Sequence, residues 1–143
     1  MKLYAESSAV LRWLLGAPQG EAVRAILARG DLVVTSALTT AEVARTLRRL
    51  RETGDLDSAM HDRAWLRFRA ALAHWDVYAV TAGILSRVEE RYPAEPLRTL
   101  DAIHLSTAVQ FSLEASPLTV VSTDRRIQIN AAGLGLAVAP VLA

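Results

Sequence analysis

Short apolar segments with the character of β-strands alternate along this chain with segments of helical periodicity. The strand candidates lie at residues 3–5, 32–34, 76–80, 118–121 and 136–138. Because neighbouring parallel strands need a crossover connection, usually a helix, this alternation predicts an α/β domain with a mainly parallel central sheet. Helices would cover both faces of that sheet, which gives a three-layer α/β/α sandwich.

The helical segments are bounded by residues that cap or break helices. We expect Ser7 or Ser8 to cap a helix that ends at Leu15, and Thr39 or Thr40 to cap one that ends at Gly54. The remaining helices are expected at residues 20–28, 57–72, 81–92, 100–111 and 125–132. No repeat or linker divides the 143 residues, so we expect a single domain over residues 1–143 with one functional site.

The composition and the absence of several motifs exclude several classes of function. The chain has no cysteine, which excludes disulfides, thiolate zinc sites and a cysteine nucleophile. Phosphate-binding glycine loops and a Gly-x-Ser-x-Gly elbow are also absent, which argues against nucleotide cofactors and a Ser-His-Asp hydrolase. An aspartate phosphatase would carry Asp-x-Asp where this chain has Glu6-Ser7-Ser8. A phospho-acceptor receiver would need a lysine, and the chain's one lysine, Lys2, begins the first strand.

The distribution of charge sets limits on location and partners. The longest uncharged stretch, residues 127–143, contains a proline and is shorter than the roughly 20 apolar residues that cross a bilayer. We expect a cytoplasmic protein with no targeting sequence and no membrane span. The net charge is only +1, but fifteen of the sixteen basic residues are arginines, several of them within residues 45–51 and 63–69. These arginines could bind phosphate groups or simply form solvated helix faces.

Four acidic residues come from four separate segments that meet at one edge of the predicted sheet. Glu6 follows the first strand directly, and Asp124 follows the strand at residues 118–121. We expect Glu42 in the first turn of the helix after the second strand, and Asp101 in the first turn of the helix after a proline-containing loop. The functional crevice of an open parallel sheet lies beyond the carboxyl ends of its strands, so these acids are the candidate site.

Each acid taken alone has an ordinary structural explanation. Asp101 and Glu42 could complement helix dipoles, Asp124 could be a helix N-cap, and Glu6 could be a surface acid or an arginine partner. Their coincidence at one edge is harder to explain, because clustered carboxylates repel each other unless a cation lies between them. Oxygen ligands of this kind suit Mg²⁺, and Mn²⁺ is possible.

A divalent ion held by carboxylates indicates a phosphodiester hydrolase. The bound metal lowers the pKa of a water molecule, which can then attack phosphorus, and a cation also stabilises the charge on the leaving oxygen. The spacing of the acids leaves open whether one ion or two would bind.

Four stretches of the chain resemble the motifs of the PIN-domain nucleases, and within that family the VapC-like toxins of bacterial toxin–antitoxin pairs. They are YAESSAVL at 4–11, SALTTAEV at 36–43, LRTLDAIHLSTA at 97–108 and VVSTDRR at 120–126. The similarity covers nearly the whole chain, and the order and spacing of the motifs agree. One departure is the first acid, which is usually Asp in the family and is Glu6 here.

The resemblance implies an endoribonuclease that acts on RNA, forms a homodimer and is inhibited by a small VapB-like antitoxin that enters the catalytic groove. It also implies that Ser122 helps to hold the metal-bound water. Ser7 and Ser8 could cap their helix or bind such a water. His104 could reach the cleft as a base or substrate contact, or be a partly buried histidine bonded to a backbone group. A second interpretation of the chain is a catalytically weak PIN-fold domain that acts mainly as a protein-binding module.

Overall fold

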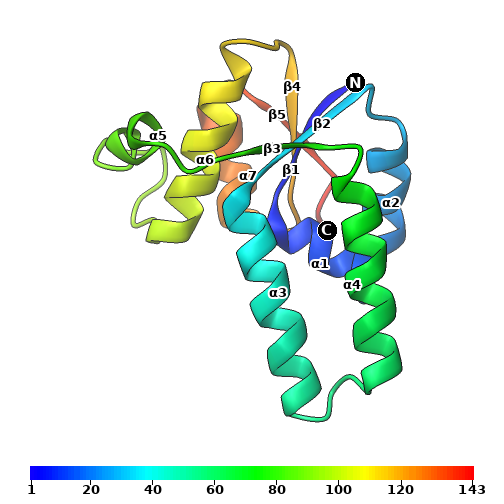
Figure 1. Ribbon diagram of the computed structural model, residues 1–143. Coiled ribbons are helices and arrows are strands. Elements are labelled where there is room, and N and C mark those ends of the chain that lie inside the picture. The colour runs from blue at the N-terminus through cyan, green and yellow to red at the C-terminus, as the bar shows by residue number, and fades with distance from the viewer.

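The computed structural model describes residues 1–143 and is built on a sheet of five parallel strands in the order β3-β2-β1-β4-β5 (Figure 1). In chain order the strands are β1 (Lys2–Ala5), β2 (Leu32–Ser36), β3 (Asp76–Tyr78), β4 (Leu118–Val121) and β5 (Ala137–Ala139). Strand β1 is central, because it pairs with β2 on one side and with β4 on the other. The predicted fold class is confirmed.

Seven helices connect and cover the strands. They are α1 (Ser7–Leu14), α2 (Gly20–Ala28), α3 (Ala37–Glu52), α4 (Ser58–Leu72), α5 (Ala82–Arg87), α6 (Thr99–Ser112) and α7 (Arg125–Gly133). Helices α3 and α4 form a long hairpin that projects beyond the sheet, while α6 and α7 pack together on the other side of the molecule (Figure 1). None of these helices combines the length and the apolar character needed to cross a bilayer.

Two apolar clusters lie on the two faces of the sheet. Leu3 and Ala5 of β1 belong to a cluster with side chains of α1 to α4, whereas Tyr4 belongs to a cluster with side chains of α6 and α7. This alternation follows from the strand geometry, in which successive side chains point to opposite faces. Burying one leucine such as Leu3 contributes about 2 kcal/mol or somewhat more, so both faces stabilise the central strand.

The start of α1 differs from the prediction. Neither Ser7 nor Ser8 is the N-cap, because Glu6 takes that position and its carboxylate accepts a hydrogen bond from the Ser8 backbone N–H. The glutamate side chain is long enough to fold back over the first turn. The cap therefore comes from the acid that the sequence marked as a site residue.

The start of α3 also differs. Strand β2 runs on through Ser36, whose hydroxyl accepts the Leu38 N–H at 3.0 Å and caps the helix, so neither Thr39 nor Thr40 is the cap. The helix therefore begins directly after the strand, and Glu42 lies in its second turn rather than its first. Other expected starts are confirmed, since Asp57 and Asp124 are the N-caps of α4 and α7.

Helix α5 is shorter than expected. It covers Ala82–Arg87 instead of residues 81–92. The chain then turns back, and Tyr92 is buried with its backbone N–H bonded to the Glu95 carboxylate at 3.0 Å. Burial of this tyrosine in the α6 and α7 cluster therefore competes with continuation of the helix.

Candidate active site

Glu6 is the centre of a hydroxyl-rich network at the carboxyl end of β1. It is 3% exposed, and its carboxylate accepts hydrogen bonds from the hydroxyls of Ser7 at 2.8 Å and Ser122 at 2.7 Å. The hydroxyl and backbone N–H of Ser8 bond to the same carboxylate. The Ser122 hydroxyl also accepts the backbone N–H of Asp124 at 3.1 Å. The three serines predicted as supporting residues therefore gather around Glu6 and connect it to the fourth acid.

Among the four acids, Asp101 is the one whose negative charge is stabilised least by nearby protein groups. It lies in the first turn of α6, and its side chain is only 14% exposed. Its Oδ2 is buried and has no hydrogen-bond partner; the nearest cation is the Arg98 guanidinium, 3.6 Å away. Burial raises the pKa of Asp101, and the charges of Asp124 and Glu6 raise it further, against the opposing charge of Arg98. A cation at this carboxylate would remove the electrostatic strain.

Asp124 combines a structural role with a place beside Asp101. Its Oδ1 accepts the backbone N–H groups of Arg126 at 2.8 Å and Ile127 at 3.4 Å, which caps α7. The ordinary explanation of this acid as an N-cap is therefore correct. This cap does not exclude a second role for Asp124. Its Oδ2 makes no such hydrogen bond, and its negative charge adds to the effect of burial in raising the pKa of Asp101.

His104 connects Glu42 to the central strand. It is 1% exposed, its Nε2 lies 2.5 Å from Glu42 Oε1, and its Nδ1 shares a 2.8 Å hydrogen bond with the Tyr4 hydroxyl. The same Nε2 lies 3.9 Å from Glu6 Oε1. The interpretation of His104 as a partly buried histidine bonded to a backbone group is therefore wrong, because its partners are side chains and it is fully buried.

The pKa values in this network follow from burial and the nearby carboxylates. Burial by itself lowers the pKa of His104, but the hydrogen bond to Glu42 and the charges of Glu6 and Glu42 outweigh it and raise the pKa overall. The pKa of Tyr4 is raised well above its usual range by burial and then by the charge of Glu6. Tyr4 therefore keeps its proton and stays a neutral partner of the histidine.

Three residues near the site were not singled out from the sequence. Tyr4 is one, although it lies two positions before Glu6 and therefore faces the same side of the sheet. The other two are Asn130 and Arg126 of α7, which hold the loop that leads into α6. Asn130 is fully buried and bonds both the N–H and the C=O of Ala94, at 2.8 and 3.1 Å, while Arg126 donates to the Pro96 carbonyl at 2.8 Å. No sequence motif indicates this clamp, because its target is backbone.

The four acids thus lie at one end of the sheet, but they do not form a ring. Glu6 is linked to Asp124 through the Ser122 hydroxyl, and Glu42 is hydrogen-bonded to His104. Burial and the charges of Asp124 and Glu6 raise the pKa of Asp101. No three His, Asp or Glu side chains are close enough together to hold a metal ion. The donor chemistry nevertheless fits Mg²⁺ or Mn²⁺, because the donors are carboxylate oxygens and the buried Oδ2 of Asp101 has no hydrogen-bond partner.

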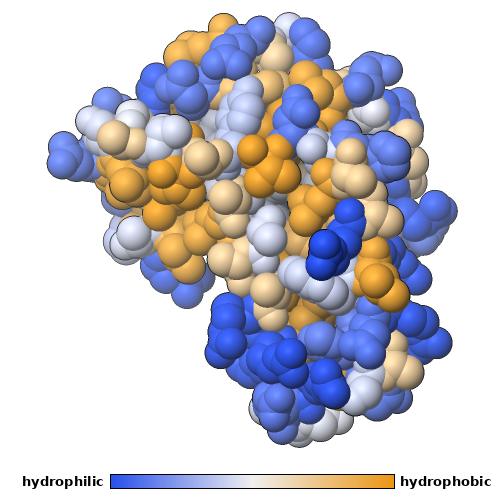
Figure 2. Space-filling view, in the orientation of Figure 1, coloured by the Kyte–Doolittle hydropathy of each residue, from blue (hydrophilic) through white to orange (hydrophobic).

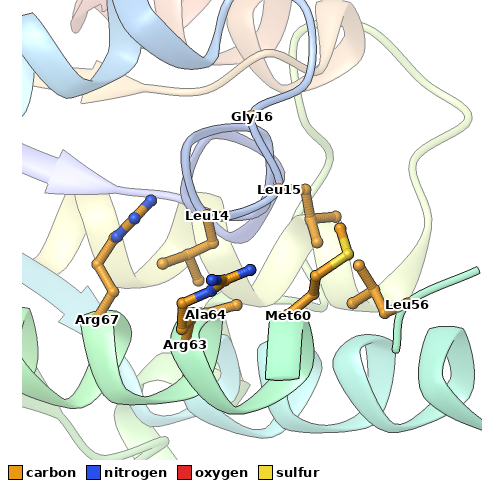
Figure 3. Close-up of a pocket in the computed structure, with 8 residues that line it drawn as sticks. All are labelled: Leu14, Leu15, Gly16, Leu56, Met60, Arg63, Ala64 and Arg67. Carbon is orange, nitrogen blue, oxygen red and sulfur yellow. The ribbon is translucent and has the colours of Figure 1, made fainter. Parts of the chain in front are cut away.

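Two hollows lie near these residues. A pocket of about 450 Å³ opens between α1, α3 and the loop after β4, and two site residues, Ser8 and Asp124, form part of its wall. A second hollow of about 380 Å³ lies between α1 and α4, where Leu14, Leu15 and Met60 face one another beside arginine side chains (Figure 3). One of the four acids, Asp124, lines the first pocket, whereas none of them lines the second.

Comparison with known proteins adds the family. The family model of the PIN domain matches residues 3–133. Ribonuclease VapC46 of Mycobacterium tuberculosis is 36% identical to this chain over 136 residues, which cover 95% of each chain. Ribonuclease VapC35 of the same bacterium is 37% identical over 106 residues, which cover 73% of this chain and 70% of that protein.

Solved structures share the fold at low sequence identity. A toxin–antitoxin complex from Klebsiella pneumoniae matches with a TM-score of 0.63 and 17% identity, covering 98% of this chain and 97% of that chain. The Mycobacterium tuberculosis toxin VapC20, described as cleaving the Sarcin-Ricin loop, matches with a TM-score of 0.63 and 16% identity, covering 90% and 94%. The family match spans most of the chain. This chain belongs to the PIN-domain family, within its VapC-like group.

Proposed function

We propose that this chain is a Mg²⁺- or Mn²⁺-dependent endoribonuclease and the toxin of a VapBC-type toxin–antitoxin pair. The observation that carries the proposal is the buried Oδ2 of Asp101, which has no hydrogen-bond partner and whose negative charge is opposed by the charges of Asp124 and Glu6. Leaving such an oxygen unpaired costs free energy, and a protein keeps this arrangement where a ligand compensates it. The relatives named ribonucleases indicate the class of substrate.

The residues have distinct roles in this proposal. Asp101 and Asp124 would bind the ion, with Glu6 and Glu42 completing the acidic site. Ser8 and Ser122 hold the Glu6 carboxylate in place, and His104 holds that of Glu42. When bound, the ion supplies an activated water and stabilises charge on the phosphate. By keeping these side chains fixed, the protein positions the RNA strand and prevents other arrangements of the reacting groups.

The proposal is tested by cleavage of RNA by the purified protein. We expect cleavage with Mg²⁺ or Mn²⁺, no cleavage after chelation, and loss of at least about a hundredfold in rate for Asp101→Asn. Asp76→Asn is the matched control, since Asp76 is an exposed acid on the edge strand β3. Equal activity of wild type and Asp101→Asn would refute the assignment. In cells, growth arrest should accompany wild type and not Asp101→Asn.

An antitoxin partner is part of the same proposal. Solved complexes with this fold contain an antitoxin, and the hollow between α1 and α4 offers a surface for one (Figure 3). Leu14 and Leu15, at the end of α1, face Met60 of α4 across this hollow, and Arg63 and Arg67 of α4 also line it. This surface suits a segment that is apolar on one side and acidic on the other.

We also propose a homodimer. Three apolar side chains, Val77, Leu85 and Leu100, are each more than 40% exposed. Figure 2 shows apolar surface gathered over the region of α5, where Leu85 lies. Exposed apolar surface of this kind marks contacts between proteins. Replacement of Leu85 by glutamate should shift the protein to monomer in light-scattering measurements, and an unchanged mass would contradict this interface.

One observation favours the second candidate, a catalytically weak protein-binding module. Glu42 is bonded to His104, and no three acidic or histidine side chains are gathered closely enough to hold an ion. The two candidates differ in metal binding. If the chain is a ribonuclease, wild type binds Mn²⁺ in calorimetric titration and Asp101→Asn does not. If it is a binding module, neither wild type nor Asp101→Asn binds Mn²⁺.

A further inference from the structure

The pocket between α1, α3 and the loop after β4 has the size and lining of a site for a flat, partly polar ring. Its volume is about 450 Å³, within the range of small-molecule sites. Three leucines, Leu11, Leu15 and Leu50, supply its apolar surface, and the hydroxyl-bearing Thr46 and Thr123 also line it. Leucines can pack against the face of a ring while hydroxyls bond to its edge.

The pocket shares a wall with the acidic site. Ser8 and Asp124 line it, and the Ser8 hydroxyl is also bonded to Glu6. Thr46 lies one helical turn beyond Glu42 on α3. A polymer with one phosphate at the acidic residues would therefore place its neighbouring unit in this pocket. This step rests on the proposed ribonuclease function.

The one cation of the pocket is free to bind an anion. Arg12 is exposed on α1 and makes no ion pair with a carboxylate, unlike Arg24 of the next helix, which is paired with Glu21. A guanidinium can bind a phosphate with two hydrogen bonds. Apolar surface, hydroxyls and one arginine together match a nucleotide, which has a ring, polar ring edges and a phosphate.

An acidic peptide fits this pocket less well. Asp124 forms part of the wall, so a carboxylate side chain entering the pocket would meet a like charge. A nucleobase is neutral and meets no such repulsion. The hollow between α1 and α4, which is lined by two arginines, is better suited to an acidic partner (Figure 3).

We propose that this pocket binds the nucleobase next to the cleaved bond and selects which nucleotide is accepted there. Arg12 holds the adjoining phosphate, and the Thr46 and Thr123 hydroxyls distinguish the edges of the bases. The ligand class is a single-stranded ribonucleotide segment, since a paired base cannot leave its stack to enter a pocket without added cost.

The test compares two substitutions at one position. Thr46→Val keeps the shape and removes the hydroxyl, whereas Thr46→Phe fills the pocket. Wild type is first given an RNA pool with randomised positions, and the ends of the products are sequenced to find the preferred nucleotide. Four short RNAs that differ only at that nucleotide then give kcat and KM for each variant. Arg12→Gln is tested against Arg67→Gln, an exposed arginine that lines the other hollow.

We expect Thr46→Phe to raise KM for the preferred RNA by about tenfold and to reduce the discrimination among the four RNAs, with little change in kcat. Thr46→Val should change the discrimination by about fivefold, the size of one hydrogen bond. Arg12→Gln should raise KM for all four RNAs, and Arg67→Gln should not. Unchanged discrimination and KM in Thr46→Phe would overturn the proposal.

A second readout does not depend on cleavage. RNA that carries the photoreactive base iodouridine is bound to Asp101→Asn protein, irradiated, and the crosslinked peptides are mapped. Crosslinks within residues 8–17 or 44–50 that disappear in Thr46→Phe support the pocket, even if wild type fails to cleave RNA and the ribonuclease proposal is lost. Crosslinks confined to other regions overturn it. Loss of antitoxin binding in Thr46→Phe without any effect on RNA would assign the pocket to a protein and also overturn it.

Discussion

Replacing Asp101 by asparagine should stabilise the protein without metal and destabilise it relative to wild type with metal. The substitution keeps the shape of the side chain and removes its charge. In the structure this charge is largely buried and its Oδ2 has no hydrogen-bond partner. Burial and the repulsion from Asp124 and Glu6 outweigh the attraction of the Arg98 guanidinium 3.6 Å away. Removing the charge without metal should therefore raise the free energy of unfolding by about 1 to 2 kcal/mol.

Metal reverses the order of stability. An ion present at about a hundred times its Kd stabilises the protein that binds it by about 2.7 kcal/mol. Asp101→Asn loses this gain, so wild type should become the more stable protein by about 1 kcal/mol. For a chain of this length a change of 1 kcal/mol moves Tm by about 3 to 5 °C. The variant should thus melt about 3 to 10 °C above wild type in chelator and about 3 to 5 °C below it in saturating Mn²⁺.

The assay is differential scanning fluorimetry of wild type, Asp101→Asn and the control Asp76→Asn, each in chelator and in a series of Mn²⁺ concentrations. The control should follow wild type in both conditions, because Asp76 is exposed on the far strand of the sheet. The reasoning is refuted if Asp101→Asn melts below wild type in chelator. It is also refuted if metal raises both Tm values equally.

Three further substitutions test other parts of the structure. Asn130→Ala removes the buried amide that holds Ala94, so it should cost about 2 to 3 kcal/mol in urea unfolding and speed amide exchange at Ala94, Glu95 and Leu97. Unchanged exchange would refute the clamp. His104→Ala leaves Glu42 and Tyr4 without their hydrogen-bond partner and should lower the free energy of unfolding by about 3 kcal/mol. His104→Gln should recover part of this loss, and equal losses in the two variants would contradict a hydrogen-bonding role. Met60→Glu places a charge in the hollow between α1 and α4 and should weaken antitoxin binding at least about tenfold, measured by calorimetry, with RNA cleavage retained.

Much of the fold was predictable because it depends on local patterns. Strands of apolar residues and helices with caps and stops are written in neighbouring residues, and a parallel sheet follows from their alternation. The position of Asp124 is an example. A strand that ends at Val121 and a helix that begins at Arg125 leave only a short turn, so the acid had to lie at the sheet edge.

The connections within the site were not predictable in the same way. The contact between His104 and Glu42 joins residues 62 positions apart and depends on how α6 and α3 pack against the sheet. The exact start of α3 also matters, because a side chain moves by about 100° around the helix with each residue. The cap at Ser36 could have been found from its place at the end of the strand, but Thr39 and Thr40 were equally good candidates by residue type.

The glutamate at position 6 explains why the acids lie in separate hydrogen-bond networks and do not form a ring. Its added methylene carries the carboxylate to Ser8 and Ser122, and a third hydroxyl from Ser7 completes its hydrogen bonds. Such a carboxylate is already stabilised by the protein and gains less from an ion than one without partners. In the proposed ribonuclease, ion binding would then depend mainly on Asp101, whose Oδ2 has no hydrogen-bond partner, and on Asp124. Shortening residue 6 to aspartate would withdraw the carboxylate from these hydroxyls, so the serines and the glutamate are best understood as one unit.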